Sequence, residues 1–120
     1  LIRGAFNEGA YITKGVSMSY RDEDGEWTPP QALYIKNYEK YDRGRQSGAT
    51  MTHDGKTLLL YMTPEKASAY NDIYFSLLQP DGSWSEPKSI GKKINTPEYD
   101  ETTPYMAADG VTMYFSSDRP

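Results

Sequence analysis

Residues 71–110 read NDIYFSLLQPDGSWSEPKSIGKKINTPEYDETTPYMAADG, and this stretch decides the fold. It opens with an apolar run from Ile73 to Leu78, turns at Pro80-Asp81-Gly82 and then reaches Trp84. Proline presets φ for the first central position of a tight turn, and glycine adopts the left-handed conformation that other residues resist. An apolar strand followed by such a turn and an aromatic residue predicts a β-hairpin.

The chain contains this hairpin twice. Residues 17–33, SMSYRDEDGEWTPPQAL, restate residues 75–90, FSLLQPDGSWSEPKSI, and the offset from Asp24 to Asp81 is 81 − 24 = 57. A second kind of Asp-Gly turn occurs at Asp54 and again at Asp109, with an offset of 109 − 54 = 55. Two hairpins per repeat of roughly 40–60 residues, with about four short strands, are typical of a propeller blade.

Composition limits the classes of function. The 120 residues carry a net charge of −4, a mean hydropathy of −0.79 and no cysteine. The lack of cysteine excludes disulfides and thiolate metal sites, and the acidic balance argues against a nucleic-acid-binding surface, which needs a basic stripe. No apolar run approaches the ~20 residues that a membrane-spanning helix needs. The sequence indicates no cofactor, no metal site and no catalytic set.

We therefore predict an all-β fold, a segment of a β-propeller built of four-stranded antiparallel blades. Residues 1–46 hold an N-terminal stretch, irregular or a weak edge strand over residues 1–15, and then the outer half of a blade. Residues 47–95 form a complete blade, and residues 96–120 form a link and the inner half of the next. Half blades leave strand edges and apolar faces uncovered, so we expect the rest of a larger propeller or a partner chain to complete them. The predicted strands are Val16–Tyr20, Trp27–Ile35, Gly48–Thr52, Thr57–Met62, Asp72–Leu78, Ser83–Ile90, Thr102–Ala107 and Val111–Ser116.

The segment Thr57–Met62, TLLLYM, is nearly all apolar. A strand that faces water on one side alternates, whereas a strand covered on both faces need not, so we expect neighbouring blades to cover this one on both sides. A helix is the alternative, but the run is short and lies between Asp-Gly and Thr-Pro. Residues 37–47 are predicted to form a solvated loop, and residues 64–71 a loop with room for one helical turn.

The repeated motifs resemble a known family. Residues 103–119 read TPYMAADGVTMYFSSDR, and residues 72–87 read DIYFSLLQPDGSWSEP. Both are similar to the TolB-type, WD-repeat-like β-propeller repeat of bacterial envelope proteins, and the resemblance covers roughly residues 16–120. The middle repeat departs from the family pattern, with Gly48-Ala49 in place of Ser-Pro and Thr63-Pro64 in place of Asp-Arg.

The resemblance implies a place in the periplasm, associated with the outer membrane, and a non-enzymatic scaffold that binds protein partners. Such propellers often precede a peptidoglycan-binding domain of the outer-membrane-protein-A type, which lies outside these residues. The alternatives are a glycan- or peptidoglycan-binding propeller with exposed Tyr and Trp side chains, a sialidase-like glycosidase, or the propeller cap of a serine peptidase. The five arginines are scattered rather than clustered as a sialidase needs, and the G-x-S-x-G motif of a peptidase is absent.

Two charged loops are the candidate partner-binding rim, because each precedes the innermost strand of a predicted blade. Paired carboxylates there can serve acid–base chemistry, although solvated surface charge is the commoner reason for such residues. We expect charge reversal at Asp100 and Glu101 to weaken partner capture. The candidate rim consists of Tyr41, Arg43, Arg45, Glu98, Tyr99, Asp100 and Glu101.

Four other motifs have structural interpretations. Asp81–Trp84 suggests the Asp-box of sugar enzymes, but its spacing is shorter and a structural turn explains it better. Asp22–Gly25 suggests a calcium loop, yet no glutamate occupies the twelfth position that such a loop requires. His53 has no second histidine or cysteine for a zinc site, so we interpret it as decoration of a turn. Asp118 and Arg119 are predicted to form a salt bridge that fixes a loop.

Overall fold

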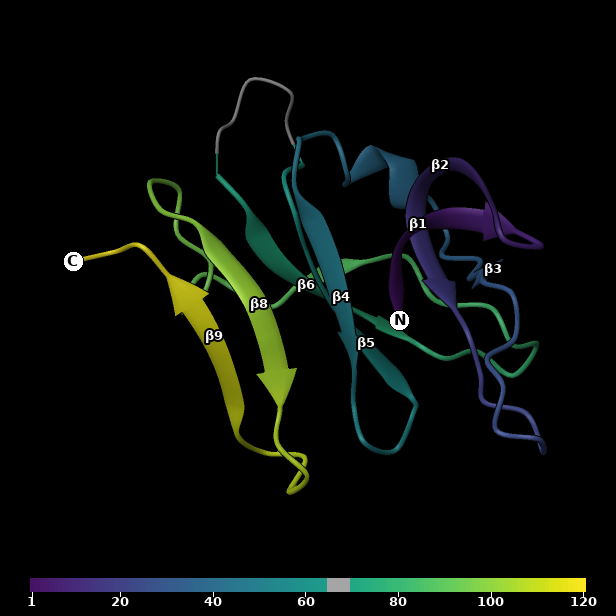
Figure 1. The fold of residues 1–120 in the computed structure, drawn as a ribbon. Coiled ribbons are helices and arrows are strands. Elements are labelled where there is room, and N and C mark those ends of the chain that lie inside the picture. The colour runs from purple at the N-terminus through teal and green to yellow at the C-terminus, as the bar shows by residue number, and fades with distance from the viewer. Residues whose placement is uncertain (65–69) are drawn as a thin grey trace.

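The computed structural model describes residues 1–64 and 70–120, and within them the strands form three antiparallel sheets that lie side by side (Figure 1). The first sheet has the order β1 (Ile2–Asn7), β2 (Ala10–Met18) and β3 (Gln31–Ala32). The second has the order β4 (Ser47–Met51), β5 (Thr57–Met62), β6 (Asp72–Leu77) and β7 (Lys88–Ser89). The third pairs β8 (Glu101–Met106) with β9 (Met113–Ser117), and a 3-10 turn, η1 (Tyr38–Lys40), precedes β4.

The second sheet is the predicted meander of four consecutive antiparallel strands. β5 and β6 pair without interruption from Thr57–Leu77 to Met62–Asp72. The outer strand of this sheet, predicted over Ser83–Ile90, is shorter than predicted. Its regular part, β7, has only two residues, and Trp84 forms only an isolated bridge with Leu78. Pro87 has no N–H to donate to a ladder, which limits pairing on its N-terminal side.

β5 is buried on both faces, as its apolar run predicts. Leu58, Leu60 and Met62 pack with residues of the first sheet and its connection to β4 in one core cluster. Because side chains alternate along a strand, Leu59 points to the opposite face, where β8 packs beside β5. Each of these side chains is at most 2% exposed, and burying a leucine contributes roughly 1.5–3 kcal/mol.

The N-terminal stretch is more regular than the sequence suggests, because β1 and most of β2 form a hairpin over residues 2–18. The register of this pair shifts near Gly4, which has a φ of 104°. The buried hydroxyl of Ser17 donates to the Gly4 carbonyl at 2.8 Å and accepts the Phe6 N–H at 2.9 Å. The first sheet therefore has three strands rather than only the outer half of a blade.

The prediction of a solvated loop over residues 37–47 is wrong in part. Tyr38 and Asp42 are buried, and the Tyr38 hydroxyl donates to Asp42 Oδ2 at 2.9 Å. Burial, and then the Asp42 charge, raises the pKa of Tyr38 well above its ordinary value. The loop predicted at residues 64–71 falls largely on 65–69, which lie outside the described residues.

The two hairpins that turn at Asp24-Gly25 and Asp81-Gly82, here called the outer hairpins, repeat in the hydrogen bonds between their strands as well as in their sequence. Ser19 Oγ donates to the Thr28 carbonyl at 2.5 Å. Ser76 occupies the equivalent place in the second copy, and its Oγ donates to the Ser85 carbonyl at 2.5 Å. The Thr28 hydroxyl also accepts the N–H of Tyr20, and the Ser85 hydroxyl likewise accepts the N–H of Leu77.

The two hairpins that turn at Asp54-Gly55 and Asp109-Gly110, here called the inner hairpins, repeat in the same way at the offset of 55 residues. The Gly55 N–H donates to the Thr52 carbonyl at 2.9 Å, and the Gly110 N–H donates to the Ala107 carbonyl at 3.0 Å. Asp54 and Asp109 each accept the N–H of the residue two positions on. The second and third sheets therefore begin with the same inner hairpin.

Candidate functional site

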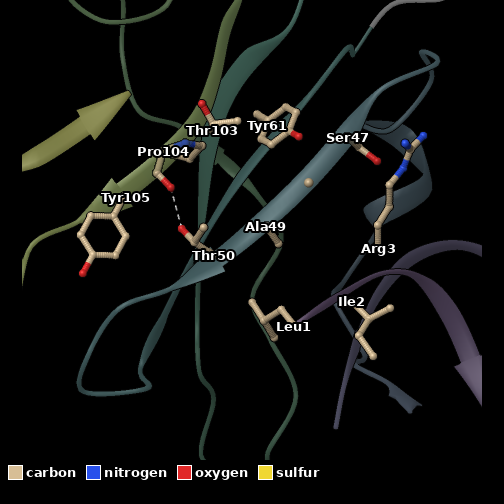
Figure 2. A pocket seen from close by; sticks show the side chains of 11 residues that line it. Leu1, Ile2, Arg3, Ser47, Ala49, Thr50, Tyr61, Thr103, Pro104 and Tyr105 are labelled. Atoms are coloured by element: carbon tan, nitrogen blue, oxygen red, sulfur yellow. Dashed lines mark hydrogen bonds between the residues drawn. The ribbon is translucent and has the colours of Figure 1, made fainter. Parts of the chain in front are cut away.

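A groove of about 410 Å³ separates the N-terminal residues from β8 and has β4 along its floor (Figure 2). β4 is the edge strand of its sheet, so its outer backbone edge borders the groove. Figure 2 shows Arg3 near Ser47 at one end and Tyr105 at the other. The lining residues are Leu1, Ile2, Arg3, Ser47, Gly48, Ala49, Thr50, Tyr61, Thr103, Pro104 and Tyr105.

The floor of the groove depends on a glycine. Gly48 pairs with Tyr61 of β5, and the Tyr61 ring lies directly over the position that a side chain at residue 48 would take. A Cβ at this position would be 2.4 Å from the ring, a separation that real Cβ atoms do not show. Gly48 therefore lets an aromatic ring form part of the floor.

The β8 wall is attached to β4 and to the turn that follows it. Thr50 Oγ1 donates to the Pro104 carbonyl at 2.8 Å (Figure 2). His53 Nε2 lies 3.0 Å from the Tyr105 hydroxyl, and the two rings meet edge to face with centroids 6.0 Å apart. The interpretation of His53 as turn decoration is thus incomplete, because this residue joins the second sheet to the third.

A basic loop, residues 43–45, lies at the Arg3 end of the groove. Arg3 Nη2 donates to the Arg45 carbonyl at 2.6 Å, and Lys14 Nζ donates to the Gly44 carbonyl at 2.5 Å. Arg3, Lys14, Arg43 and Arg45 are all exposed, whereas the nearby Asp42 is buried and pairs with Lys14 at 3.9 Å. Two predicted rim residues, Arg43 and Arg45, therefore belong to a positively charged cluster in an acidic chain.

Tyr41, which was also predicted for the rim, lies partly in the core. It packs against the hydrophobic cluster, and its ring meets that of Tyr74 edge to face at 5.5 Å. Burial, followed by a hydrogen bond to Glu86 and the charge of that carboxylate, raises the pKa of Tyr41. Its ring therefore contributes to packing more than to an exposed surface.

The acidic link before β8 divides into exposed and structural residues. Glu98 is exposed and Tyr99 is half-buried. Asp100 Oδ1 accepts the backbone N–H of Asn71 at 2.7 Å and its side-chain amide at 3.1 Å. The Asp100 N–H donates to Asp118 Oδ1 at 2.8 Å, so Asp100 holds three segments of chain together.

Glu101 lies inside the molecule instead of on an exposed rim. Its carboxylate is fully buried, accepts the Thr96 hydroxyl at 2.6 Å and the Thr96 N–H at 3.1 Å, and pairs with Arg119 at 3.4 Å. Arg119 also donates to the Ile94 carbonyl at 2.8 Å. The predicted salt bridge of Asp118 and Arg119 is therefore wrong in its acid, because Arg119 pairs with Glu101, and this pair fixes the link from β7 to β8.

A carboxylate with a perturbed pKa lies beside Glu101. Burial, and then the charge of Glu101, raises the pKa of Asp72 from its ordinary value of 3.8 to about 6. A carboxyl group with such a pKa can exchange a proton near neutral pH. However, Glu101 is occupied by Thr96 and Arg119, so these contacts describe a structural network and not an accessible acid–base pair.

The two predicted loops are anchored at the same end of the second sheet. The Arg43 N–H donates to the Thr63 carbonyl at 2.9 Å, and Thr63 Oγ1 donates to Asn71 Oδ1 at 2.9 Å. Asn71 in turn donates to Asp100. Among residues 1–64 and 70–120, no hydrogen bond or ion pair joins the side chains of Arg43 or Arg45 to those of Glu98 or Asp100.

No family model, curated protein or solved structure matches this chain. Arg3, Ser47, Tyr61 and Thr103 were missed by the sequence analysis, although the replacement of Ser-Pro by Gly48-Ala49 in the middle repeat marks this place.

Two kinds of site find no support in the described part of the chain. Its Asp, Glu and His side chains include no group of three or more that could hold a metal ion. At Asp22–Gly25, where the sequence predicts a hairpin turn and not a calcium loop, Asp22 Oδ1 accepts the N–H groups of Asp24 and Glu26, which closes the turn. None of the helical residues described forms an apolar helix long enough to cross a membrane.

Proposed function

We propose that this chain is a segment of a β-propeller that serves as a non-enzymatic scaffold and binds protein partners in a bacterial cell envelope. The observation that supports it best is that the hairpin hydrogen bonds repeat at the same two offsets as the Asp-Gly turns. Repeats of one supersecondary unit, stacked so that each covers its neighbour, are the construction principle of propellers. The periplasmic, outer-membrane-associated location rests on the family resemblance.

The groove and the basic loop together are the surface on which we expect a partner to bind. In a propeller the first strand of each blade lines the central channel, and β4 and β8 are the first strands of their sheets. Arg3, Arg43 and Arg45 give this surface a positive charge that differs from the acidic rest of the chain. Complementary charge speeds association and selects among partners.

A glycan- or peptidoglycan-binding propeller is the second candidate. The Tyr61 ring over Gly48 and the half-exposed Tyr105 give the same groove two aromatic surfaces, on which sugar rings can stack. Peptidoglycan can also be reached through a domain outside these residues, as the resemblance implies.

Site-directed photo-cross-linking in a Gram-negative periplasmic extract tests the proposal, with the cross-linker at Tyr105. We expect a discrete protein adduct that R43E/R45E reduces by at least tenfold. The matched control is K92E/K93E, which changes the net charge by the same amount on the exposed β7–β8 link. Equal adducts in both variants would contradict a protein site here. Sedimentation with purified peptidoglycan, without any protein adduct, would favour the second candidate.

A further inference from the structure

The two equivalent tryptophans of the repeat have opposite environments. Trp27 and Trp84 occupy the same place in the two outer hairpins, which share their hydrogen bonds. Trp84 is 3% exposed, whereas Trp27 is 67% exposed. The hairpins differ in their turn acids and in Arg21, whose guanidinium lies 5.8 Å from the centre of the Trp27 ring, but both tryptophans hold the same bridge position, so the large difference in exposure reflects what packs against each indole.

An extended segment, residues 33–36, that follows β3 pairs with the backbone of Trp84, whose indole is buried in the core cluster. Ile35 and Trp84 form a parallel bridge. The Trp84 N–H donates to the Tyr34 carbonyl at 2.8 Å, and the Lys36 N–H donates to the Trp84 carbonyl at 3.1 Å. Both outward-facing backbone groups of Trp84 are therefore satisfied by this one segment, and Ile35 is buried against the cluster that contains the indole.

The corresponding groups of Trp27 face outward without a partner among residues 1–64 and 70–120. Its neighbours close the hairpin, since the Asp22 N–H donates to the Glu26 carbonyl and the Thr28 N–H donates to the Tyr20 carbonyl. That arrangement turns the N–H and C=O of Trp27 away from the hairpin, as it does for Trp84. Beside Trp27 lies a cavity of about 420 Å³, lined by Leu1, Ile2, Ser19, Trp27, Thr28 and Pro30.

We propose that the outward backbone edge of Trp27 and the cavity beside it, together called the Trp27 flank, form a docking surface. Its occupant is an extended segment of another repeat of this kind, with the chemistry of residues 33–36. An apolar side chain would cover the indole, and the segment's backbone would pair in parallel with both free groups of Trp27. A lysine at the position of Lys36 suits this flank, because the adjacent turn, residues 21–26, carries four acidic residues against the single Arg21, which lies over the Trp27 ring. The proposal is independent of the partner assigned to the groove.

A tethered copy of the segment tests this. Residues 31–37, QALYIKN, are fused to Leu1 through a Gly/Ser linker of about ten residues, which gives an effective concentration on the order of millimolar. Leu1 lines the same cavity as Trp27, so such a linker reaches the flank. The matched control carries the Ile35→Asp change in the fused copy alone.

Two measurements report on Trp27. Hydrogen exchange of the Trp27 amide is expected to slow at least tenfold in the fusion but not in the control. Acrylamide quenching of the tryptophan fluorescence should fall toward the level of the W27F variant, in which Trp84 alone emits. If Trp84 stays protected from quenching, the protein is folded; an unchanged Trp27 amide and unchanged quenching would then overturn the proposal. Equal effects of both fused copies would also overturn it, because they would show non-specific coverage.

Discussion

Gly48 and Tyr61 show how a single hydrogen in place of a methyl group shapes the groove. Gly48 does not need a left-handed conformation, so its importance is purely steric. Its pairing with Tyr61 across β4 and β5 places the ring over the glycine and beside the wall formed by β8. Glycine weakens a strand interior by about 0.5–1 kcal/mol relative to alanine, and here the ring covers the exposed backbone.

We therefore predict that Gly48→Ala destabilises the protein by about 1–2 kcal/mol in urea unfolding, because the ring must turn away from the new methyl group. In a Tyr61→Ala background the same change should be neutral or slightly stabilising, since alanine is the better strand residue. An equal cost in both backgrounds would mean that Tyr61 is not the side chain that Gly48 accommodates.

The Asp72 carboxyl predicts a dependence of stability on pH. Its pKa in the folded protein, about 6, lies above its ordinary value of 3.8, so the folded state binds this proton more tightly between about pH 4 and pH 6. The stability that Asp72 contributes is thus present at low pH and is lost as the pH rises through 6. Because the group is partly exposed, solvent screening reduces the effect.

Asp72→Asn removes this proton equilibrium and the repulsion from Glu101. We expect the variant to be more stable than the wild type at pH 7.5 and to lose most of that advantage by pH 4.5, because the unfolded carboxyl is fully protonated only below pH 3.8. The measurement is the free energy of unfolding in urea for both proteins at several pH values. A constant difference between them across this range would show that Asp72 does not titrate as described.

At the scale of elements, the two outer hairpins reach the same turn with different acids. Asp81 Oδ1 accepts the Ser83 N–H at 2.9 Å and its hydroxyl at 2.6 Å, and these bonds lower the pKa of Asp81. In the first hairpin Asp22, two positions before Asp24, accepts the backbone N–H groups. Asp24 and Asp81, which are equivalent in the two repeats, therefore have different roles in their turns.

We predict that Asp81→Ala and Asp22→Ala each lower the urea midpoint, whereas Asp24→Ala leaves it unchanged within error. Since the folded pKa of Asp81 is lowered, its contribution is present above pH 4 and is lost as the pH falls through the folded value. Unfolding curves at pH 7 and pH 3 check both statements. A loss for Asp24→Ala as large as that for Asp81→Ala would contradict the assignment.

The strands of the second sheet were predictable because local pattern and burial agree there. Three consecutive leucines between an Asp-Gly turn and Thr-Pro leave a doubly covered strand as the simplest arrangement, and β5 has the predicted bounds. The N-terminal hairpin was not predictable, because its irregular register depends on the Ser17 hydroxyl reaching Gly4, 13 residues away. The extent of pairing was overestimated at β7, where Pro87 has no N–H to donate, and at β3, after which residues 33–36 pair with the distant Trp84.

For the molecule as a whole, the candidate site could be predicted only in part. Arg43 and Arg45 are found at an exposed loop, as their charge indicates. Arg3 was missed because its contact with Arg45 spans 42 residues. Glu101 was misplaced because a carboxylate in a charged run reads as solvated, and only Thr96 and Arg119, supplied by other segments, allow it to be buried.

The third sheet gives a prediction for the whole molecule in solution. Within the described residues β9 pairs only with β8, so its other edge has no strand beside it, and Tyr114 is 63% exposed. An exposed edge with apolar side chains is a template for pairing with another chain, and lysine on such an edge opposes it. We therefore expect the chain to self-associate with rising concentration, and Tyr114→Lys to weaken this association at least tenfold.

Sedimentation velocity across a concentration series measures the change, and circular dichroism verifies that the variant is folded. Lys substitution of the equally exposed Tyr11, on β2 of the first sheet, is the matched control. If both lysine variants reduce association equally, net charge and not the β9 edge explains it.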